Sequence, residues 1–185
     1  GVSLTLTTPT EHLPVDFDLY LPKSWAEDKA RRKEAKIPGT VKFRTKPEIA
    51  LDMIRRAVAN GLPKGVVLGD VAYGGNGRFR KEVRDLGLHY GLAVGATTTV
   101  WLTNRKGNKV DDAVQVRHLA QRIVEAGGFR KTTWREGTNK SLSARFAFRR
   151  VISAHDDGYE PNERELIWLV MEWEKGEAAP SKYHF

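Results

Sequence analysis

The residue best placed to do chemistry in this sequence is Asp70, which follows a short apolar run at residues 66–68 and precedes a Gly-rich turn. The run predicts a buried strand, and the spacing of Phe79, Val83 and Leu86 predicts a helix after it. In open α/β sheets, ligands and catalytic groups collect at the carboxyl ends of the strands. Asp70 is therefore a candidate oxygen ligand for Mg2+ or Mn2+. The alternative is a structural carboxylate that accepts hydrogen bonds from the amides of the turn.

A catalytic metal site needs further acids, because two-metal phosphoryl transfer uses several carboxylates that converge from different strands. Asp16 and Asp18 lie two residues apart on an expected strand. We interpret them as the solvent face of an outer strand, with a pair of functional acids as the alternative. The remaining candidates qualify only by residue type, and they are Asp156, Asp157, Glu172 and Glu174.

Several other site motifs are absent from the sequence. The Gly-rich segment at residues 74–77 lacks both phosphate-loop spacings, so it predicts a tight turn with Asn76 as the N-cap of the next helix. The five His are scattered and there is no Cys, which argues against a zinc site and excludes disulfides and thiolate catalysis. Neither a G-x-S-x-G serine-hydrolase motif nor a D-x-D-x-T phosphatase motif occurs.

The composition favours a polyanionic partner. The chain of 185 residues has a formal charge of +8, and such a balance is typical of proteins that bind nucleic acid. A protein that is merely basic is the alternative. No apolar run approaches the roughly 20 residues that span a bilayer, and no signal-peptide pattern opens the chain. Together with the lack of cysteine, these features indicate a cytoplasmic protein with no membrane partner.

The N-terminal part predicts a hairpin followed by a helix. Alternating apolar residues predict strands at 2–7 and 15–21, joined by a short polar turn. A helix begins at Lys46, with Pro in its first turn, and ends at Gly61. The highly charged residues 23–45 between them are either a basic contact to nucleic acid or a solvated excursion that contains a short helix.

The strand before Asp70, its helix and a buried strand at 89–95 predict an α/β arrangement. Strands linked by helices pair in parallel, so the sheet is expected to be mixed. The continuously apolar residues 166–171 predict a strand that is covered on both faces and returns to this sheet. A last strand is expected at the end of the chain.

Residues 96–162 differ in composition and predict a basic α+β insertion. Within them we expect a helix at about 111–126 and two strands at 129–135 and 142–152. The second strand carries Arg145, Arg149 and Arg150. The predicted division is a first core part at residues 1–95, the insertion at 96–162 and return strands at 163–185.

Blocks of sequence along nearly the whole chain occur in the order found in one family. They are LYLPKSW at 19–25 with Asp28, Arg31 and Arg32, FRTKPE at 43–48, GDVAYG at 69–74, WREGT at 134–138, RFA at 145–147 and PSKY at 180–183. With these blocks the chain resembles transposases of bacterial insertion sequences. More narrowly, it resembles the DDE superfamily endonuclease branch of the DDE transposases.

The resemblance implies an RNase H-like fold, a mixed sheet flanked by helices, with an insertion before the last catalytic helix. It also implies that Asp70 is the second carboxylate of the D-D-E triad. The first Asp of the family would then lie on a strand upstream of Gly1, and the Glu on a helix after Phe185. The chain would be the central part of the catalytic domain, without its first strand and last helix, and inactive or nearly so by itself.

The resemblance further implies a parent protein that cleaves DNA and transfers the strand to a target. Water and then a DNA 3′-hydroxyl would attack phosphodiesters, with two Mg2+ or Mn2+ ions bridged by Asp70 once the missing acids are present. The DNA partners would be transposon ends and target, and a dimeric parent is an expected arrangement in the complex. The alternative function is a basic DNA-binding module that does no chemistry.

Candidate DNA contacts are basic side chains that reach phosphates and aromatic rings that stack on bases. We expect the phosphate contacts at Lys46, Arg78, Arg135, Arg145 and Arg149. Trp101 and Trp134 are the candidate stacking residues, and a packed core position is the alternative for each.

Overall fold

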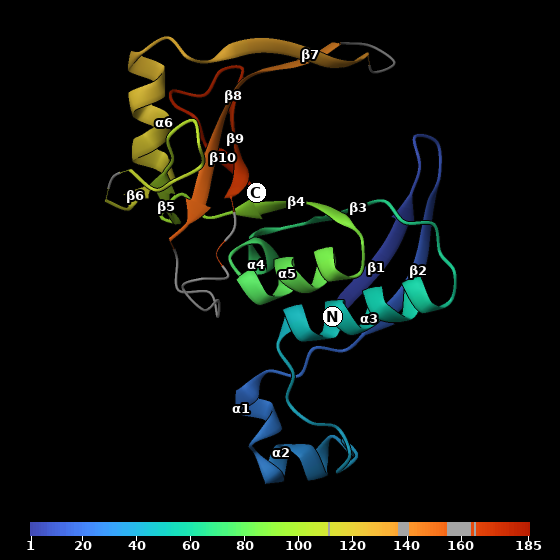
Figure 1. The fold of residues 1–185 in the computed structure, drawn as a ribbon. Coiled ribbons are helices and arrows are strands. Elements are labelled where there is room, and N and C mark those ends of the chain that lie inside the picture. Colours follow the sequence, from blue (N-terminus) through green and yellow to red (C-terminus); the bar gives the residue numbers. More distant parts are fainter. Residues whose placement is uncertain (111, 137–140, 155–163, 165) are drawn as a thin grey trace. The chain divides into compact units, whose positions relative to one another are not determined.

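The computed structural model describes residues 1–185 except 111, 137–140, 155–163 and 165 (Figure 1). The chain divides into two compact units. The first contains Gly1–Gly65 and Glu82–Leu88, and the second contains Val66–Lys81 and His89–Phe185. Each unit has a sheet of its own.

The first unit begins with an antiparallel hairpin of β1 (Val2–Thr7) and β2 (His12–Asp18). This confirms the predicted hairpin, although β2 begins and ends three residues earlier than expected. A bulge leaves Val15 out of the pairing and sets Asp16 opposite Leu4. Beyond the bulge, Asp16 and the apolar Leu4 therefore lie on the same face of the hairpin.

Helix α3 (Lys46–Ala59) packs on this hairpin and confirms the predicted helix. Its buried Ile49 and Met53 form one apolar cluster with Val2 of β1. The chain leaves the helix through Gly61, whose φ of 78° lies in the left-handed region that glycine adopts without strain. Both end signals thus acted as the sequence indicated.

A capping box opens α3. The Thr45 side chain accepts a hydrogen bond from the backbone N–H of Glu48, and the Glu48 carboxylate accepts one from the Thr45 N–H at 2.7 Å. Thr45→Ala is therefore expected to lower the free energy of unfolding by about 1 kcal/mol, measured by urea denaturation. Thr10→Ala, in the exposed turn of the hairpin, is the control. An equal loss in both variants would contradict a role for the cap.

The charged segment between the hairpin and α3 folds into two short helices, α1 (Lys23–Ala26) and α2 (Lys29–Glu34). Asp28 is the N-cap of α2, and its carboxylate accepts from two backbone N–H groups at 3.0 Å. Arg32 ties the segment together by donating to the backbone carbonyls of Ala26, Pro38 and Val41. The guanidinium of Arg32 therefore stabilises the fold of this segment through intramolecular hydrogen bonds.

The second unit begins with β3 (Val66–Gly69), which pairs in parallel with β4 (His89–Val94) as predicted for strands linked by helices. Two helices connect them. The short α4 (Val71–Gly74) was not foreseen, and α5 (Gly77–Asp85) follows the Gly-rich turn. The residues of α5 belong to both units, because the division falls between Lys81 and Glu82.

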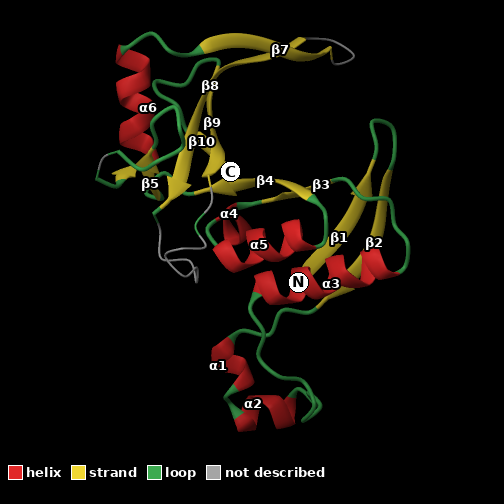
Figure 2. Cartoon of the chain, viewed as in Figure 1, coloured by secondary structure: helices red, strands yellow, loops and turns green. Residues whose placement is uncertain are grey.

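The described strands of the second unit form one mixed sheet of eight strands (Figure 2). Its order is β3-β4-β10-β9-β8-β5-β6, with β7 paired to β8, and every pairing except β3 with β4 is antiparallel. A mixed α/β fold with a large mixed sheet and helices is thus confirmed. The further strands are β5 (Thr99–Leu102), β6 (Val114–Gln115), β7 (Arg130–Glu136), β8 (Ser141–Ser153), β9 (Leu166–Glu174) and β10 (Lys182–His184).

Helix α6 (Val116–Glu125) packs on one face of this sheet. The predicted start at residue 111 is wrong, because residues 114 and 115 form β6 and the helix begins only at Val116. The core between helix and sheet is made of buried apolar side chains, among them Val116, Leu119, Ile123, Ala147, Val151, Leu169 and Met171. The other face of β8 and β9 lacks this covering helix.

Two predictions of burial are wrong. The run at residues 66–68 was expected to be buried, yet Val66 is 59% and Leu68 is 74% exposed. The cause is the position of β3 at the end of the described sheet. The run at 166–171 was expected to be covered on both faces, yet Trp168 is 53% exposed. Alternate residues of β9 point away from the core that α6 covers.

Candidate functional site

Asp70 lies directly after β3, at the carboxyl end of that strand, as the sequence pattern predicted. It is the N-cap of α4, and its Oδ1 accepts a hydrogen bond from the backbone N–H of Ala72 at 2.8 Å. The structural role considered for Asp70 is therefore present. The residue is exposed, and no ion pair with Asp70 occurs among the residues that the structure describes. Its carboxylate is thus accessible for a second role.

The helix that begins at Asp70 is held tightly against the sheet through Gly74. A Cβ atom at Gly74 would lie 1.9 Å from the carbonyl oxygen of Ala93 in β4. The buried Arg80 donates a hydrogen bond to the carbonyl of Gly74, and its guanidinium lies 5.1 Å from the ring centroid of Phe185. The backbone around Asp70 is therefore fixed by close packing and by a buried side-chain hydrogen bond.

The charge of Asp70 acts on the neighbouring Tyr73. Burial raises the pKa of the Tyr73 hydroxyl, and the charge of Asp70 raises it further. The Gly-rich segment beyond is a turn, as predicted, because the Asn76 side chain accepts from the N–H of Phe79 at 2.9 Å at the start of α5. Asn76 is thus the helix cap that the sequence predicted at this turn.

The residues that the structure describes do not complete a metal site at Asp70. They contain no group of three or more His, Cys, Asp or Glu side chains able to hold an ion. Glu174 is ion-paired with Lys182 at 2.5 Å, and Glu172 lies opposite Lys182 in the pairing of β9 with β10. Asp156 and Asp157 lie outside the described residues. One carboxylate does not fit the donor set of a catalytic metal pair, so we derive no step through such ions.

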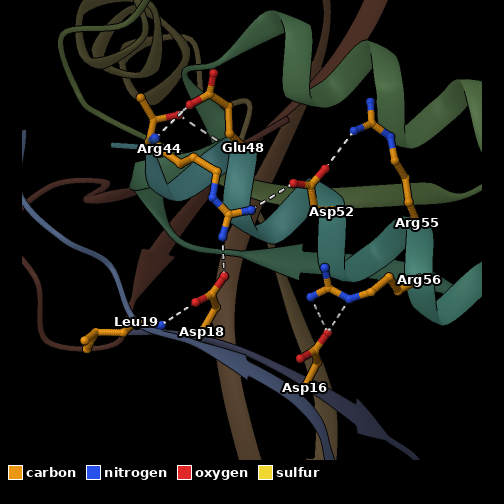
Figure 3. A network of polar contacts seen from close by, with 9 residues as sticks. Asp16, Asp18, Leu19, Arg44, Glu48, Asp52, Arg55 and Arg56 are labelled. Atoms are coloured by element: carbon orange, nitrogen blue, oxygen red, sulfur yellow. Dashed lines mark hydrogen bonds and ion pairs between the residues drawn. The ribbon is translucent and has the colours of Figure 1, made fainter. Parts of the chain in front are cut away.

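The interpretation of Asp16 and Asp18 as a solvent face is wrong. Both carboxylates bind arginines of their own unit, Asp16 to Arg56 at 2.7 and 3.1 Å, and Asp18 to Arg44 (Figure 3). Phe17 between them is 67% exposed instead. The bulge at Val15 is the physical reason, because it turns the acids toward the side of the hairpin on which α3 packs.

The ion pairs continue along α3. Arg44 also binds Asp52 at 3.0 Å, and Arg55 binds the other oxygen of Asp52 at 3.0 Å (Figure 3). Arg55 is also ion-paired with Glu82. The acids of the first unit are thus engaged with cations in a structural network. This engagement argues against the alternative of Asp16 and Asp18 as a pair of functional acids.

The hydrogen bond from Arg56 is the main cause that lowers the pKa of Asp16. Because the pKa of Asp16 is lower in the folded than in the unfolded state, the pair stabilises the fold above about pH 4, and this contribution is lost as the pH falls. Arg56→Met is expected to raise the Asp16 pKa toward its ordinary value of 3.8, measured by NMR titration. Arg31→Met, at an exposed ion pair of α2, should leave that pKa unchanged. A pKa insensitive to Arg56→Met would refute this assignment.

Two predicted phosphate contacts fall in different units. Lys46 begins α3 in the first unit, with its Nζ 5.6 Å from the ring centroid of Tyr20. Arg78 is exposed in the first turn of α5, in the second unit. Arg135 belongs to β7, but its side chain is outside the description. DNA contact by these three residues therefore stays a prediction.

Arg145 and Arg149 are exposed on β8. The guanidinium of Arg145 lies 4.6 Å from the ring centroid of Trp173, and both line a cavity of about 290 Å³. The cavity is of mixed charge, since its wall contains Lys131, Lys175, Glu174 and Glu177. Arg149 donates to the carbonyl of Phe148 at 3.2 Å. Arg145 thus lines a concave surface of the second unit.

The two predicted stacking residues differ in exposure. Trp134 is 51% exposed and meets Phe146 edge-on, with ring centroids 5.5 Å apart. Trp101 is half-buried, and its ring centroid is 4.3 Å from Lys109 Nζ and 5.1 Å from the guanidinium of Arg164. The ring of Trp101 is therefore already occupied by cations.

Sequence reasoning missed three exposed residues on the same sheet: Phe148, Arg150 and Trp168. Alternation along β8 sets Phe148 and Arg150 on the face opposite the buried Ala147 and Val151. Arg150 pairs in register with Trp168, and its guanidinium lies 5.1 Å from the Trp168 ring centroid. The alternation of aromatic and small apolar residues along β8 is the sequence signal that could have identified this exposed face.

Comparison with known proteins supports the resemblance found in the sequence. Residues 1–141 match the family described as DDE superfamily endonuclease. No curated protein and no solved structure matched the chain. Among the described residues, no helix combines the length and the apolar character that crossing a membrane requires. Because the matched segment covers well over half of the chain and includes Asp70, the chain belongs to the family of DDE superfamily endonucleases.

Proposed function

We propose that this chain is the central part of the catalytic domain of an insertion-sequence transposase, and that Asp70 is the second carboxylate of its D-D-E triad. The position of Asp70 carries the proposal: an accessible carboxylate at the carboxyl end of a parallel strand, inside the segment that matches the family. DNA is the substrate that this family implies. The proposed reaction is cleavage of DNA strands followed by strand transfer.

The proposal includes an RNase H-like core, with residues 96–162 as an insertion and 163–185 as return strands. DDE enzymes generally use divalent metals, and we propose Mg2+ or Mn2+ here. Such ions would be held only together with acids that the described residues do not bring to Asp70. The cytoplasm is the proposed location, since the DNA of a bacterial cell lies there.

A second candidate is a basic DNA-binding module that does no chemistry. The formal charge of +8 and the exposed arginines of β8 favour it. It would need no acids near Asp70. The catalytic domain requires the carboxylate of Asp70, whereas the binding module does not. A measurement of DNA strand cleavage therefore distinguishes the two candidate functions.

The test is Mn2+-dependent nicking of a labelled duplex by this chain and by a longer protein that extends it at both ends. We expect cleavage by the longer protein and almost none by the chain alone. Salt-sensitive binding of DNA by both proteins without cleavage by either would favour the binding module. Absence of both activities would refute the two candidates together.

A further inference from the structure

Four aromatic side chains form a row across three adjacent strands of the second unit. Trp134 of β7 meets Phe146 of β8 at 5.5 Å between ring centroids, and Phe146 stacks on Phe148 at 6.5 Å. Phe148 and Trp168 follow as diagonal neighbours, since Phe148 pairs with Val170 and Arg150 pairs with Trp168. We call Trp134, Phe146, Phe148 and Trp168 the aromatic row.

The aromatic row lies on the face of the sheet that α6 does not cover. The core on the opposite face contains Ala147, Val151 and Leu169 from the same strands. Trp134, Phe148 and Trp168 are 51%, 53% and 53% exposed, respectively. Large rings that burial would stabilise by about 2 kcal/mol each are thus left in contact with water. A patch of this kind indicates a binding surface.

Cations accompany the row and identify the chemistry of its partner. Arg150 lies 5.1 Å from the ring centroid of Trp168. On the neighbouring β5, Trp101 pairs with Ile152 of β8, and its ring centroid lies 4.3 Å from Lys109 Nζ and 5.1 Å from the guanidinium of Arg164. Exposed aromatic rings on a face that also carries guanidinium groups suit a partner that is flat, aromatic and negatively charged. Nucleotides have all three properties.

The flat faces of the rings favour unpaired nucleotides over a duplex. In duplex DNA the bases stack on one another and offer only their edges in the grooves. Unpaired bases expose their faces, and each one stacked on an aromatic side chain contributes substantially to affinity. From these contacts we infer that the aromatic row is a binding platform for single-stranded DNA, with Arg150 as a phosphate contact. This inference rests on the proposed function for DNA as the partner.

The test is binding in EDTA, by fluorescence anisotropy, of a labelled oligothymidylate of about 16 nucleotides and of a duplex of equal length. Trp168→Ala and Phe148→Ala should each weaken binding of the single strand about 10-fold, with duplex binding unchanged. Trp168→Phe, which keeps a ring, should restore most of the affinity. The control is Trp25→Ala, because Trp25 is 39% exposed and lies 5.5 Å from Arg31 in the other unit.

Equal binding of the single strand by wild type and by both alanine variants would overturn the inference. Equal losses of affinity for the single strand and the duplex would also overturn it. So would a wild-type chain that does not bind the oligothymidylate, and that result would point to a protein as the partner of the aromatic row. Because EDTA removes divalent metal ions and no cleavage is measured, this binding does not depend on the catalytic role proposed for Asp70. Loss of stacking and loss of catalysis are therefore distinguishable.

Discussion

Asp70→Asn lowers the rate of DNA strand cleavage by the longer protein at least about 1000-fold, equivalent to roughly 4 kcal/mol of transition-state stabilisation, if Asp70 has the proposed role. Asparagine is as good an N-cap as aspartate, so its amide oxygen can still accept from the Ala72 N–H. The variant removes one negative charge and little else. The initial rate of nicking with Mn2+ is the measurement, and the unfolding midpoint verifies that the fold is intact.

Asp28→Asn is the matched control for this experiment. Asp28 is also the N-cap aspartate of a short helix, and it accepts from the N–H groups of Ala30 and Arg31. Its substitution should leave cleavage unchanged. If Asp70→Asn cleaves as fast as wild type, Asp70 is only a cap and the proposed triad is wrong. If both variants lose activity equally, the effect comes from removing a negative charge anywhere on the protein rather than from the position of Asp70.

Gly74→Ala is expected to lower the free energy of unfolding of the second unit by about 3 kcal/mol or more. In an ordinary helix this change would be favourable, because alanine has the higher helix propensity. Here the added methyl group would lie 1.9 Å from the carbonyl oxygen of Ala93 and 2.8 Å from its carbon. Strand β4 lies between β3 and β10 in the sheet, so its backbone cannot yield easily. Helix α4 would have to leave the sheet.

The neighbouring glycine supplies the control. A Cβ atom at Gly75 meets no atom within 4 Å, and its φ of −72° is open to any residue. Gly75→Ala should therefore be neutral or slightly stabilising in urea denaturation. Since Asp70 begins the same helix, Gly74→Ala should also impair any activity that depends on Asp70. Equal stability of the two variants would show that α4 does not pack on β4 in this way.

The parts of the fold that could be predicted from sequence are those with local signals. Helix α3 has Thr45 and Pro47 at its start and Gly61 after its end, and each signal acts within a single turn of chain. Asp70 was located for the same reason, because the strand, the carboxylate and the turn are contiguous. The parallel pairing of β3 with β4 followed from the helices that link them.

The faces of the strands could not be predicted in this way. Alternation along β2 indicates two faces but not which one a helix covers, and the single extra residue at Val15 exchanges them. Without that bulge, Val15 rather than Asp16 would lie opposite Leu4. Pro14 is compatible with a bulge but equally with an unbulged edge strand, so the ion pair between Asp16 and Arg56 was beyond sequence reasoning.

The aromatic row depends on pairing between strands far apart in sequence. Phe148 and Trp168 become neighbours only in the register of β8 with β9. The apolar run at 166–171 is equally compatible with a strand covered on one face or on both. The pairing of strands also explains why sequence did not identify the acids that would complete a site with Asp70. Glu174, one of the candidates, forms an ion pair with Lys182 of the neighbouring strand β10.

The exposed side chains of β3 have a further consequence for the behaviour of the protein in solution. Among the described strands, β3 is an end strand, and its apolar Val66 and Leu68 are in contact with solvent. Unpaired backbone groups beside apolar side chains are a template for intermolecular β-pairing and aggregation. The charges of Lys64 before the strand and Asp70 after it act as gatekeepers against such pairing. Asp70 would thus also protect solubility, and losing its charge makes this edge of the sheet more prone to self-association.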